Sequence, residues 1–212
     1  MKKVTNTENK FDKAAGQWDS KPKRVQLAQA VAEAIIKQLP LNPEIKALDF
    51  GCGTGLVGLE LVSYLKSLTA VDTSRGMLAE LDSKVREKEL KTVSIREVDL
   101  LVKNLGEKFN LIFSSMTLHH IDNIEEILKQ FYDHLYPGGY LAIADLEKED
   151  GNFHSPDAVG VKHHGFDRNH FSDLLLTTGF SEINFRTVFE FDKEKEGRPV
   201  SYPVFLMTAR KK

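Results

Sequence analysis

Hydrophobic residues recur with two different periods along this chain, and the two periods alternate. From Val25 to Leu39 they follow one helix face; Pro22 stands where helices often begin, and Pro40 and Pro43 end the helix. Further on, short apolar runs typical of buried strands alternate with helical segments. We expect strands at 45–50, 68–71, 93–98, 109–114 and 139–144, with helices between them at 56–65, 75–87 and 124–135. This alternation is typical of a doubly wound α/β fold, a parallel sheet with helices on both faces.

The pattern changes after Asp145. Residues 146–166 are polar and interrupted by glycine and proline, which predicts a lid-like loop. A helix is expected at 168–178, and two strands at 182–190 and 201–209 then form an antiparallel hairpin around the charged turn 192–198. With residues 1–40 as an N-terminal helical cap, the elements predict a single domain over residues 1–212.

Composition narrows the class of protein. The 29 Lys and Arg residues balance 31 Asp and Glu residues, so a nucleic acid is not the expected partner. The single cysteine cannot form an internal disulfide or a cysteine zinc cage, which points to a reducing compartment. No apolar run approaches the roughly 20 residues of a membrane span, and the N-terminus lacks the apolar core of a signal peptide. We therefore expect a cytoplasmic protein.

The most informative segment joins the first strand to the helix that follows it, and reads Asp49-Phe50-Gly51-Cys52-Gly53-Thr54-Gly55. Alternate glycines permit a tight turn and let a ligand approach the backbone closely. The carboxyl end of a strand beside a helix start is also where open α/β sheets bind ligands. A simple tight turn would explain one glycine, but three in this context favour a ligand site.

Two cofactor classes fit this segment. The glycine spacing from Gly53 to Gly58 matches the dinucleotide pattern, and Asp72 can accept both ribose hydroxyls in either case. An NAD(P)-dependent oxidoreductase is therefore one alternative. Asp49 argues against it, because a carboxylate there repels a pyrophosphate and attracts a cationic group. Asp99, at the end of the third strand, suits an adenine amino group.

These segments resemble the class I S-adenosylmethionine-dependent methyltransferases, and the resemblance covers about residues 11–209. The matching segments are 49–55, 70–78, 98–100, 109–115 and 135–141. Asn110 departs from the pattern, since the family more often has Asp there. The small-molecule methyltransferases of quinone biosynthesis are the most similar group. The resemblance implies a seven-stranded sheet of order 3-2-1-4-5-7-6 with the seventh strand antiparallel, S-adenosyl-L-methionine as cofactor, and S-adenosyl-L-homocysteine as product.

The resemblance also implies which residues touch the cofactor. The glycine segment passes its methionine part, Asp72 binds the ribose, and Met77 lies near the adenine. Arg24 in the cap pairs with its carboxylate, while Trp18 and Phe11 either line an apolar pocket or simply pack the cap. The predicted contacts are Asp49, Gly51, Cys52, Gly53, Asp72, Thr73, Met77, Asp99, Leu100, Ser114, Trp18 and Arg24.

Methyl transfer makes few demands on side chains, because alignment and exclusion of water do most of the work. A general base is needed only if the acceptor must lose a proton. His119, after the fourth strand, is the candidate; its alternative role is a local hydrogen bond. Transfer to a small-molecule acceptor is the favoured function. A protein that binds S-adenosylmethionine without catalysis is the other alternative.

The histidines after the fifth strand match no recognised metal-binding spacing, so no metal site is predicted. They indicate a loop that faces the substrate, and His163, His164 and Phe166 are its expected contacts.

Overall fold

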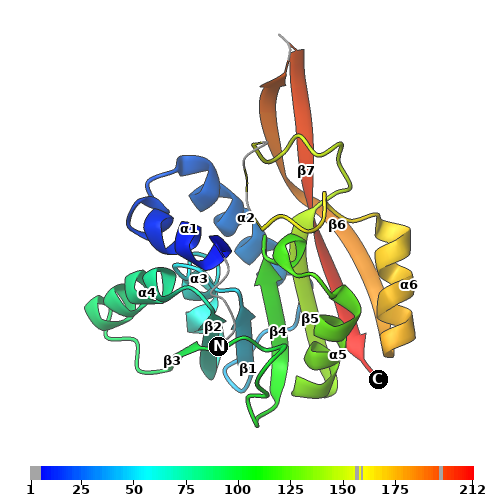
Figure 1. The fold of residues 1–212 in the computed structure, drawn as a ribbon. Helices are drawn as coiled ribbons and strands as arrows, with labels where there is room; N and C mark the ends of the chain where they lie inside the picture. The colour runs from blue at the N-terminus through cyan, green and yellow to red at the C-terminus, as the bar shows by residue number, and fades with distance from the viewer. Residues whose placement is uncertain (1–5, 156–157, 159, 196–197) are drawn as a thin grey trace.

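The computed structural model describes residues 6–155, 158, 160–195 and 198–212. Its seven strands form one sheet of order β3-β2-β1-β4-β5-β7-β6 (Figure 1). β7 runs antiparallel to both β5 and β6, and the other neighbours are parallel. This order confirms the predicted fold. The strands are Lys46–Phe50 (β1), Ser67–Asp72 (β2), Val93–Glu97 (β3), Phe109–Ser115 (β4), Leu135–Leu146 (β5), Phe180–Lys195 (β6) and Arg198–Lys211 (β7).

Local capping explains where several helices begin and end. The side chains of Ser74, Asn123 and Asp167 accept hydrogen bonds from the first turns of α4, α5 and α6, and Gly179 ends α6 with a φ of 109°. The helices are Asn6–Ala14 (α1), Pro22–Gln38 (α2), Gly58–Leu61 (α3), Arg75–Glu87 (α4), Ile124–His134 (α5) and Arg168–Thr178 (α6). None of the described helices is long and apolar enough to cross a membrane.

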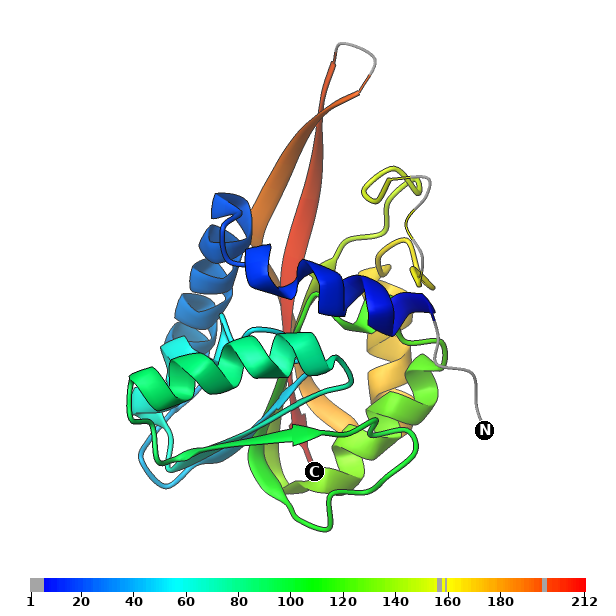
Figure 2. The same ribbon diagram turned by 60° about the vertical axis from the view of Figure 1, so that its left-hand side comes forward.

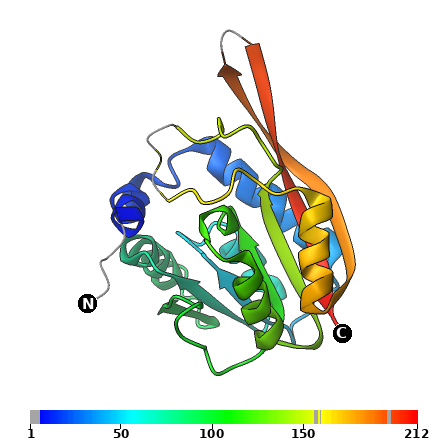
Figure 3. The same cartoon turned by 45° about the vertical axis from the view of Figure 1, so that its right-hand side comes forward.

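The sheet is buried on both faces. Along β4, Leu111 and Phe113 pack in the core formed with α2 and α3, whereas Ile112 points the other way, into the core formed with α5 and α6. α4 covers Ala70 of β2 on the same side as α2. Figure 3 shows α5 and α6 side by side on their face of the sheet. Because helices cover both faces of the sheet, the loops gather at the edge formed by the carboxyl ends of the parallel strands.

Four elements differ from the prediction. The helix expected at 56–65 is only α3 followed by the 3-10 turn Val62–Tyr64 (η2), because residues up to 57 are still part of the glycine turn. β5 begins at Leu135 instead of 139, directly where α5 ends. β6 and β7 are longer than expected, and their hairpin projects well beyond the rest of the sheet (Figure 2). Residues 192–195 of the predicted turn thus belong to β6, while 196 and 197 lie outside the described residues.

The predicted lid-like segment, which we call loop 146–166, is tied down at its base. Glu147 and Phe166 form an isolated β-bridge, and Glu149 N donates to His164 O at 2.9 Å. The carbonyl oxygen of His119 accepts hydrogen bonds from the backbone N–H groups of Lys162 (2.8 Å) and His163 (3.1 Å). The returning half of the loop is therefore attached to the turn that follows β4. Figure 3 shows the loop crossing above the carboxyl end of β4.

Candidate functional site

The glycine segment forms a compact turn fixed to the end of β2. Gly51 N and Cys52 N both donate to Val71 O, at 2.9 and 3.0 Å. Gly51 has a φ of +66°, and a Cβ atom there would lie 2.2 Å from Cγ2 of Thr117. Only glycine fits this position, for both reasons. The hydroxyl of Thr117 in turn donates to Gly51 O at 3.2 Å, so the turn after β4 is packed directly on the glycine turn.

Asp72 links this turn to the start of α4. Its Oδ2 accepts from Gly53 N at 2.8 Å, and its Oδ1 accepts from Ser74 N at 2.9 Å. Burial raises the pKa of Asp72 even though these backbone hydrogen bonds lower it. Each carboxylate oxygen keeps a lone pair beyond these bonds. Asp72 is thus held in place with acceptor capacity left for a pair of hydroxyls.

Asp49 is the most unusual residue of the site. Its side chain is buried, and Oδ2 has no hydrogen-bond partner among the described residues. Burial raises its pKa well above the usual range, and the negative charge of Asp72 raises it further. Neither carboxylate forms an ion pair with a cation in the described part of the chain. A buried and a half-buried carboxyl group side by side, with no cation paired to either in the described residues, favour a positively charged ligand.

The other predicted contacts of the first, second and fourth strands are mostly enclosed. Burial raises the pKa of the Cys52 thiol, so it is neither a thiolate nor a ready nucleophile. The Met77 sulfur lies 4.0 Å from the position a Cβ atom on Gly53 would take, beneath the turn. Ser114 is buried, and its hydroxyl donates to Phe50 O at 2.9 Å. The hydroxyl proton is therefore used in a hydrogen bond between neighbouring strands.

The end of β3 approaches Asp72 through the backbone. Val98 N donates to Asp72 O at 3.1 Å, which brings the exposed Asp99 to the same edge. Oδ1 of Asp99 accepts from Leu101 N at 3.0 Å. Leu100 is only 1% exposed and packs in the core, so its side chain points away from this edge. Thr73 is exposed directly after Asp72.

The N-terminal cap is bound to both sides of this edge. Oδ1 of Asp12 accepts from Ser74 Oγ at 2.6 Å and from Gly76 N at 2.9 Å. Oδ1 of Asp19 accepts from Thr54 Oγ1 at 2.6 Å, and its Oδ2 pairs with the ammonium group of Lys84. The sequence reasoning missed both carboxylates, because nothing in their spacing separates them from the solvent-facing charges of the cap.

Aromatic side chains of the cap reach the turn after β4. The ring of Phe11 lies 5.9 Å from that of Trp18 and 5.3 Å from that of His120. The guanidinium carbon of Arg24 lies 3.5 Å from the Trp18 ring centroid, and Nη1 donates to Trp18 O at 3.4 Å. Phe11 and Trp18 thus form a wall between the cap and His120. Arg24, predicted to pair with a cofactor carboxylate, is stacked on this wall.

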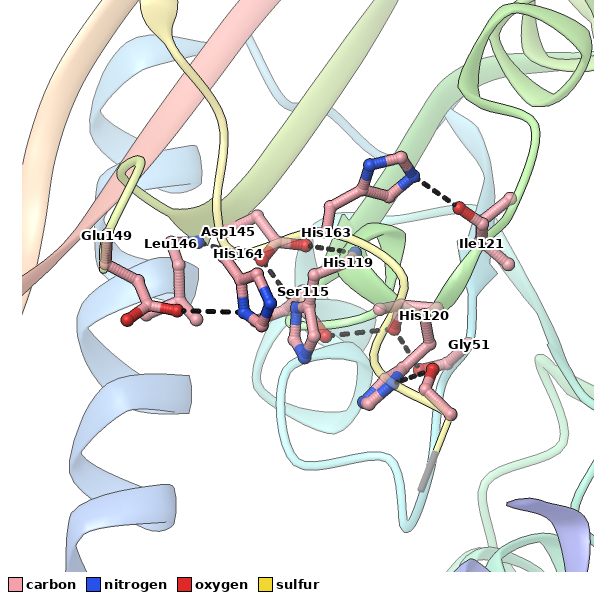
Figure 4. A network of polar contacts seen from close by, with 12 residues as sticks. Gly51, Ser115, His119, His120, Ile121, Asp145, Leu146, Glu149, His163 and His164 are labelled. Carbon is pink, nitrogen blue, oxygen red and sulfur yellow. Dashed lines mark hydrogen bonds and ion pairs between the residues drawn. The ribbon is translucent and has the colours of Figure 1, made fainter. Parts of the chain in front are cut away.

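His119 and Asp145 form a buried pair (Figure 4). Nδ1 of His119 lies 2.7 Å from Oδ1 of Asp145, which also accepts from Leu146 N at 2.8 Å. Oδ2 accepts from His119 N at 3.3 Å. The carboxylate makes Nδ1 the protonated nitrogen of a neutral His119, which leaves the Nε2 lone pair available as a base. Sequence reasoning did not assign Asp145 this role, although its place at the end of β5, beside β4, was a usable signal.

The three residues of loop 146–166 that were expected to contact the substrate bind other parts of the protein. His163 Nε2 donates to Ile121 O at 2.8 Å, and His164 pairs with Glu149 (Figure 4). Phe166 is buried in the core beside Phe171. Another histidine of the loop, His154, contacts the His119 ring instead. No group of three or more His, Cys, Asp or Glu side chains within the described ranges is arranged to hold a metal ion.

A family model described as a methyltransferase domain matches residues 24–188, which is most of the chain. This chain belongs to the methyltransferase-domain family. The match includes the glycine turn, Asp72, the His119–Asp145 pair and loop 146–166. Membership of this family favours the methyltransferase interpretation of the glycine turn over the nicotinamide one.

Three methyltransferases are similar to this chain. An uncharacterized methyltransferase of Schizosaccharomyces pombe is 36% identical over 132 residues, covering 56% of this chain and 46% of that protein. Phosphoethanolamine N-methyltransferase 1 of Zea mays is 29% identical over 154 residues, covering 70% and 30%. Phosphoethanolamine N-methyltransferase 2 of Haemonchus contortus, solved with S-adenosyl-L-methionine, superposes with a TM-score of 0.75 at 16% identity, covering 99% of this chain and 61% of that one.

The chain spans less than half the length of the two relatives matched by sequence. The similarity to the quinone-biosynthesis group is not confirmed by these relatives. The Haemonchus contortus structure, at 16% identity, supports the fold alone.

Proposed function

We propose that this chain binds S-adenosyl-L-methionine and transfers its methyl group to a small-molecule acceptor. The observation that carries the proposal is the buried carboxyl group of Asp49 beside the half-buried carboxyl group of Asp72, neither of them with a cationic partner among the described residues. A ligand with a positive charge reduces the electrostatic repulsion between these two carboxylates, whereas the negative charges of a dinucleotide pyrophosphate add to it. S-adenosylmethionine carries a sulfonium and an ammonium group together with a ribose that suits Asp72.

The residues at this edge fit the parts of that ligand. Asp72 would hold the ribose hydroxyls, Asp99 and Met77 would contact the adenine, and the backbone of Gly51 and Gly53 would pass its amino-acid part. When bound, S-adenosylmethionine supplies a methyl group that is already activated by its sulfonium. The cap, attached through carboxylates at both sides of the edge, excludes water from the reacting atoms.

His119 is proposed as the general base. Asp145 holds its ring in one tautomer and stabilises the imidazolium that forms when Nε2 takes a proton. The hydrogen bond from Thr117 to Gly51 supports this role, because it joins the turn that carries His119 to the glycine turn. A binder without catalysis would not require such a pair.

The names of the relatives support the reaction class. The Zea mays and Haemonchus contortus proteins are named for methylation of phosphoethanolamine, and the latter is described in complex with S-adenosylmethionine. The balanced charge of this chain supports a small acceptor over a nucleic acid. Its single, buried cysteine supports a reducing compartment, and we propose the cytoplasm.

Calorimetry and thermal unfolding with four ligands test the proposal. S-adenosylmethionine and S-adenosylhomocysteine at 100 times their dissociation constants should each stabilise the protein by about 2.7 kcal/mol. NAD⁺ and NADPH at the same concentrations should not. Stabilisation by a nicotinamide nucleotide alone would show that the glycine turn binds a dinucleotide. Release of S-adenosylhomocysteine in the presence of candidate acceptors then distinguishes an enzyme from a silent binder.

A further inference from the structure

Three histidine rings from two separate segments form a cluster next to the proposed cofactor edge. His119 and His120 belong to the 3-10 turn Leu118–His120 (η3) after β4, and His154 belongs to loop 146–166. The ring centroids lie 4.2 Å apart for His119 and His120, 5.0 Å for His119 and His154, and 5.9 Å for His120 and His154. Phe11 of the cap contacts the His120 ring. The cluster therefore lies between the cap and the loop.

Hydrogen bonding leaves unsatisfied nitrogens in this cluster. His119 uses Nδ1 to donate to Asp145, and His120 uses Nδ1 to donate to Gly160 O at 2.9 Å. Since a carbonyl oxygen can only accept, each neutral ring is left with a lone pair on Nε2. His154 Nε2 is buried and has no hydrogen-bond partner among the described residues. An Nε2 lone pair without a partner is suited to a ligand that presents hydrogen-bond donors.

The surroundings disfavour a positive charge on His120 and on His154. Burial lowers the pKa of His120 and of His154 to about 4, and a charge on His119 opposes their protonation further. The other charged groups facing these rings are Asp145, Lys10 and Lys193. The two lysines disfavour a cationic ligand, and the opposing effect of Asp145 on the pKa of His120 and of His154 is smaller than that of burial. Near neutral pH, both rings are thus uncharged: His120 accepts hydrogen bonds at Nε2, and His154 does so in its Nδ1–H tautomer.

His154 is held in place by the projecting hairpin of β6 and β7. The neighbouring Phe153 packs against Phe191 (5.2 Å between ring centroids) and Tyr202 (5.5 Å). The ammonium group of Lys193 lies 4.1 Å from the Phe153 ring centroid and donates to Phe153 O. The projecting hairpin thereby anchors the part of loop 146–166 that carries His154.

We propose that His119, His120 and His154 form the acceptor subsite, and that the acceptor is a neutral compound with two neighbouring hydrogen-bond donors, one being the hydroxyl or thiol that is methylated. This inference rests on the proposed methyl transfer. His119 Nε2 removes the proton while a lone pair of the acceptor oxygen or sulfur bonds to the methyl carbon. The electron pair of the broken carbon–sulfur bond stays on the sulfur of S-adenosylhomocysteine, and the proton then leaves His119 for water. His154 and His120 accept from the second donor and orient the acceptor.

A graded set of probes tests the subsite on the protein saturated with S-adenosylhomocysteine. Catechol presents two neighbouring donors, guaiacol one, and veratrole none, with nearly the same ring. We expect catechol to bind at least tenfold more tightly than veratrole, with guaiacol between them. His154→Phe, which keeps a ring of similar size, and His119→Asn should each reduce this preference severalfold. His154→Gln should retain part of it, and the exposed His170→Asn should change nothing. Equal binding of catechol and veratrole would overturn the proposal.

The same measurements separate this inference from the proposed function. Both His154→Phe and His119→Asn should keep the native affinity for S-adenosylhomocysteine. If the native protein does not bind that compound, the proposed function fails, and the probe series on the free protein still tests the cluster. If it binds but the three probes bind alike, only the acceptor subsite fails.

Histidine ¹⁵N spectra test the cluster without any acceptor. His119 and His120 should appear as Nδ1–H tautomers, and His120 and His154 should stay neutral down to about pH 5. Asp145→Asn should shift the tautomer equilibrium of His119 and leave that of His120 unchanged, which identifies Asp145 as a positioning residue. Titration of His120 or His154 near the ordinary histidine pKa would contradict the proposal.

Discussion

Asp19 of the N-terminal cap accepts a hydrogen bond of 2.6 Å from Thr54 of the glycine turn, across 35 residues of sequence. The same carboxylate pairs with Lys84 of α4, whose ammonium group also donates to Thr54 O at 2.7 Å. One side chain thus joins the cap, the glycine turn and α4. The cap is therefore part of the proposed cofactor site and is more than a covering element.

Replacing Asp19 with Ala should loosen the cap over that site. Because the ion pair is partly exposed, we expect a cost of about 1 kcal/mol, or roughly a fivefold weaker affinity for S-adenosylmethionine. Calorimetry measures the affinity, and limited proteolysis of the cap reports its detachment. Asp82→Ala, which breaks only the surface pair with Arg86, is the matched control. Equal effects of the two substitutions would mean that the cap does not contribute to the site.

Replacing Asp72 with Ala should weaken cofactor binding by about 1.5–3 kcal/mol, because the ribose hydroxyls lose a charged hydrogen-bond acceptor. The same substitution leaves the N–H groups of Gly53 and Ser74 without their acceptor, so the free protein should also lose stability. Affinity and the free energy of unfolding without ligand are therefore measured separately. Asp99→Ala, at an exposed position, should cost less on both measures. Unchanged affinity in the Asp72 variant would place the ribose elsewhere.

Gly51→Ala should destabilise the protein more than Gly106→Ala does. Both glycines have a positive φ, +66° and +72°, but a Cβ atom on Gly106 meets nothing within 4 Å. The backbone cost of about 1–2 kcal/mol is common to both, so the difference in free energy of unfolding measures the collision with Thr117. Adding Thr117→Ala to Gly51→Ala should recover part of that difference. No recovery would assign the loss to the backbone alone.

Asp49→Asn should change the dependence of stability on pH. Because the folded protein raises the pKa of Asp49, folding binds a proton there above the unfolded value of about 3.9. Stability contributed by the neutral carboxyl is present below that value and is lost as pH rises toward the folded pKa.

The Asp49→Asn variant lacks this loss, so its stability relative to the native protein should increase with pH, starting near pH 4. Urea unfolding at a series of pH values measures the difference. S-adenosylmethionine should bind more weakly to the variant, since the cation loses its partner. A constant difference in the free energy of unfolding across this pH range would show that burial does not raise the pKa of Asp49.

Apolar runs of strand length and helical periods are local properties, so they predicted which segments form strands and helices. The strand order followed from the family resemblance of the motif segments. Glycine spacing together with Asp49 and Asp72 also indicated the edge at which we propose that the cofactor binds, since the carboxyl ends of neighbouring parallel strands meet at one edge. The helix predicted at 56–65 was wrong, because the glycine turn uses residues that the apolar pattern assigned to that helix.

The contacts between side chains that are distant in sequence depend on tertiary packing. Asp12 and Asp19 look like surface charges until the cap docks and they find Ser74 and Thr54. Likewise His154 was one of several loop histidines, and no spacing distinguished it from His163. Packing distinguishes them: Phe153 is buried against the long hairpin, and the adjacent His154 therefore lies next to His119. Such pairings depend on the closure of loops between remote segments, which leaves no periodic signal in the sequence.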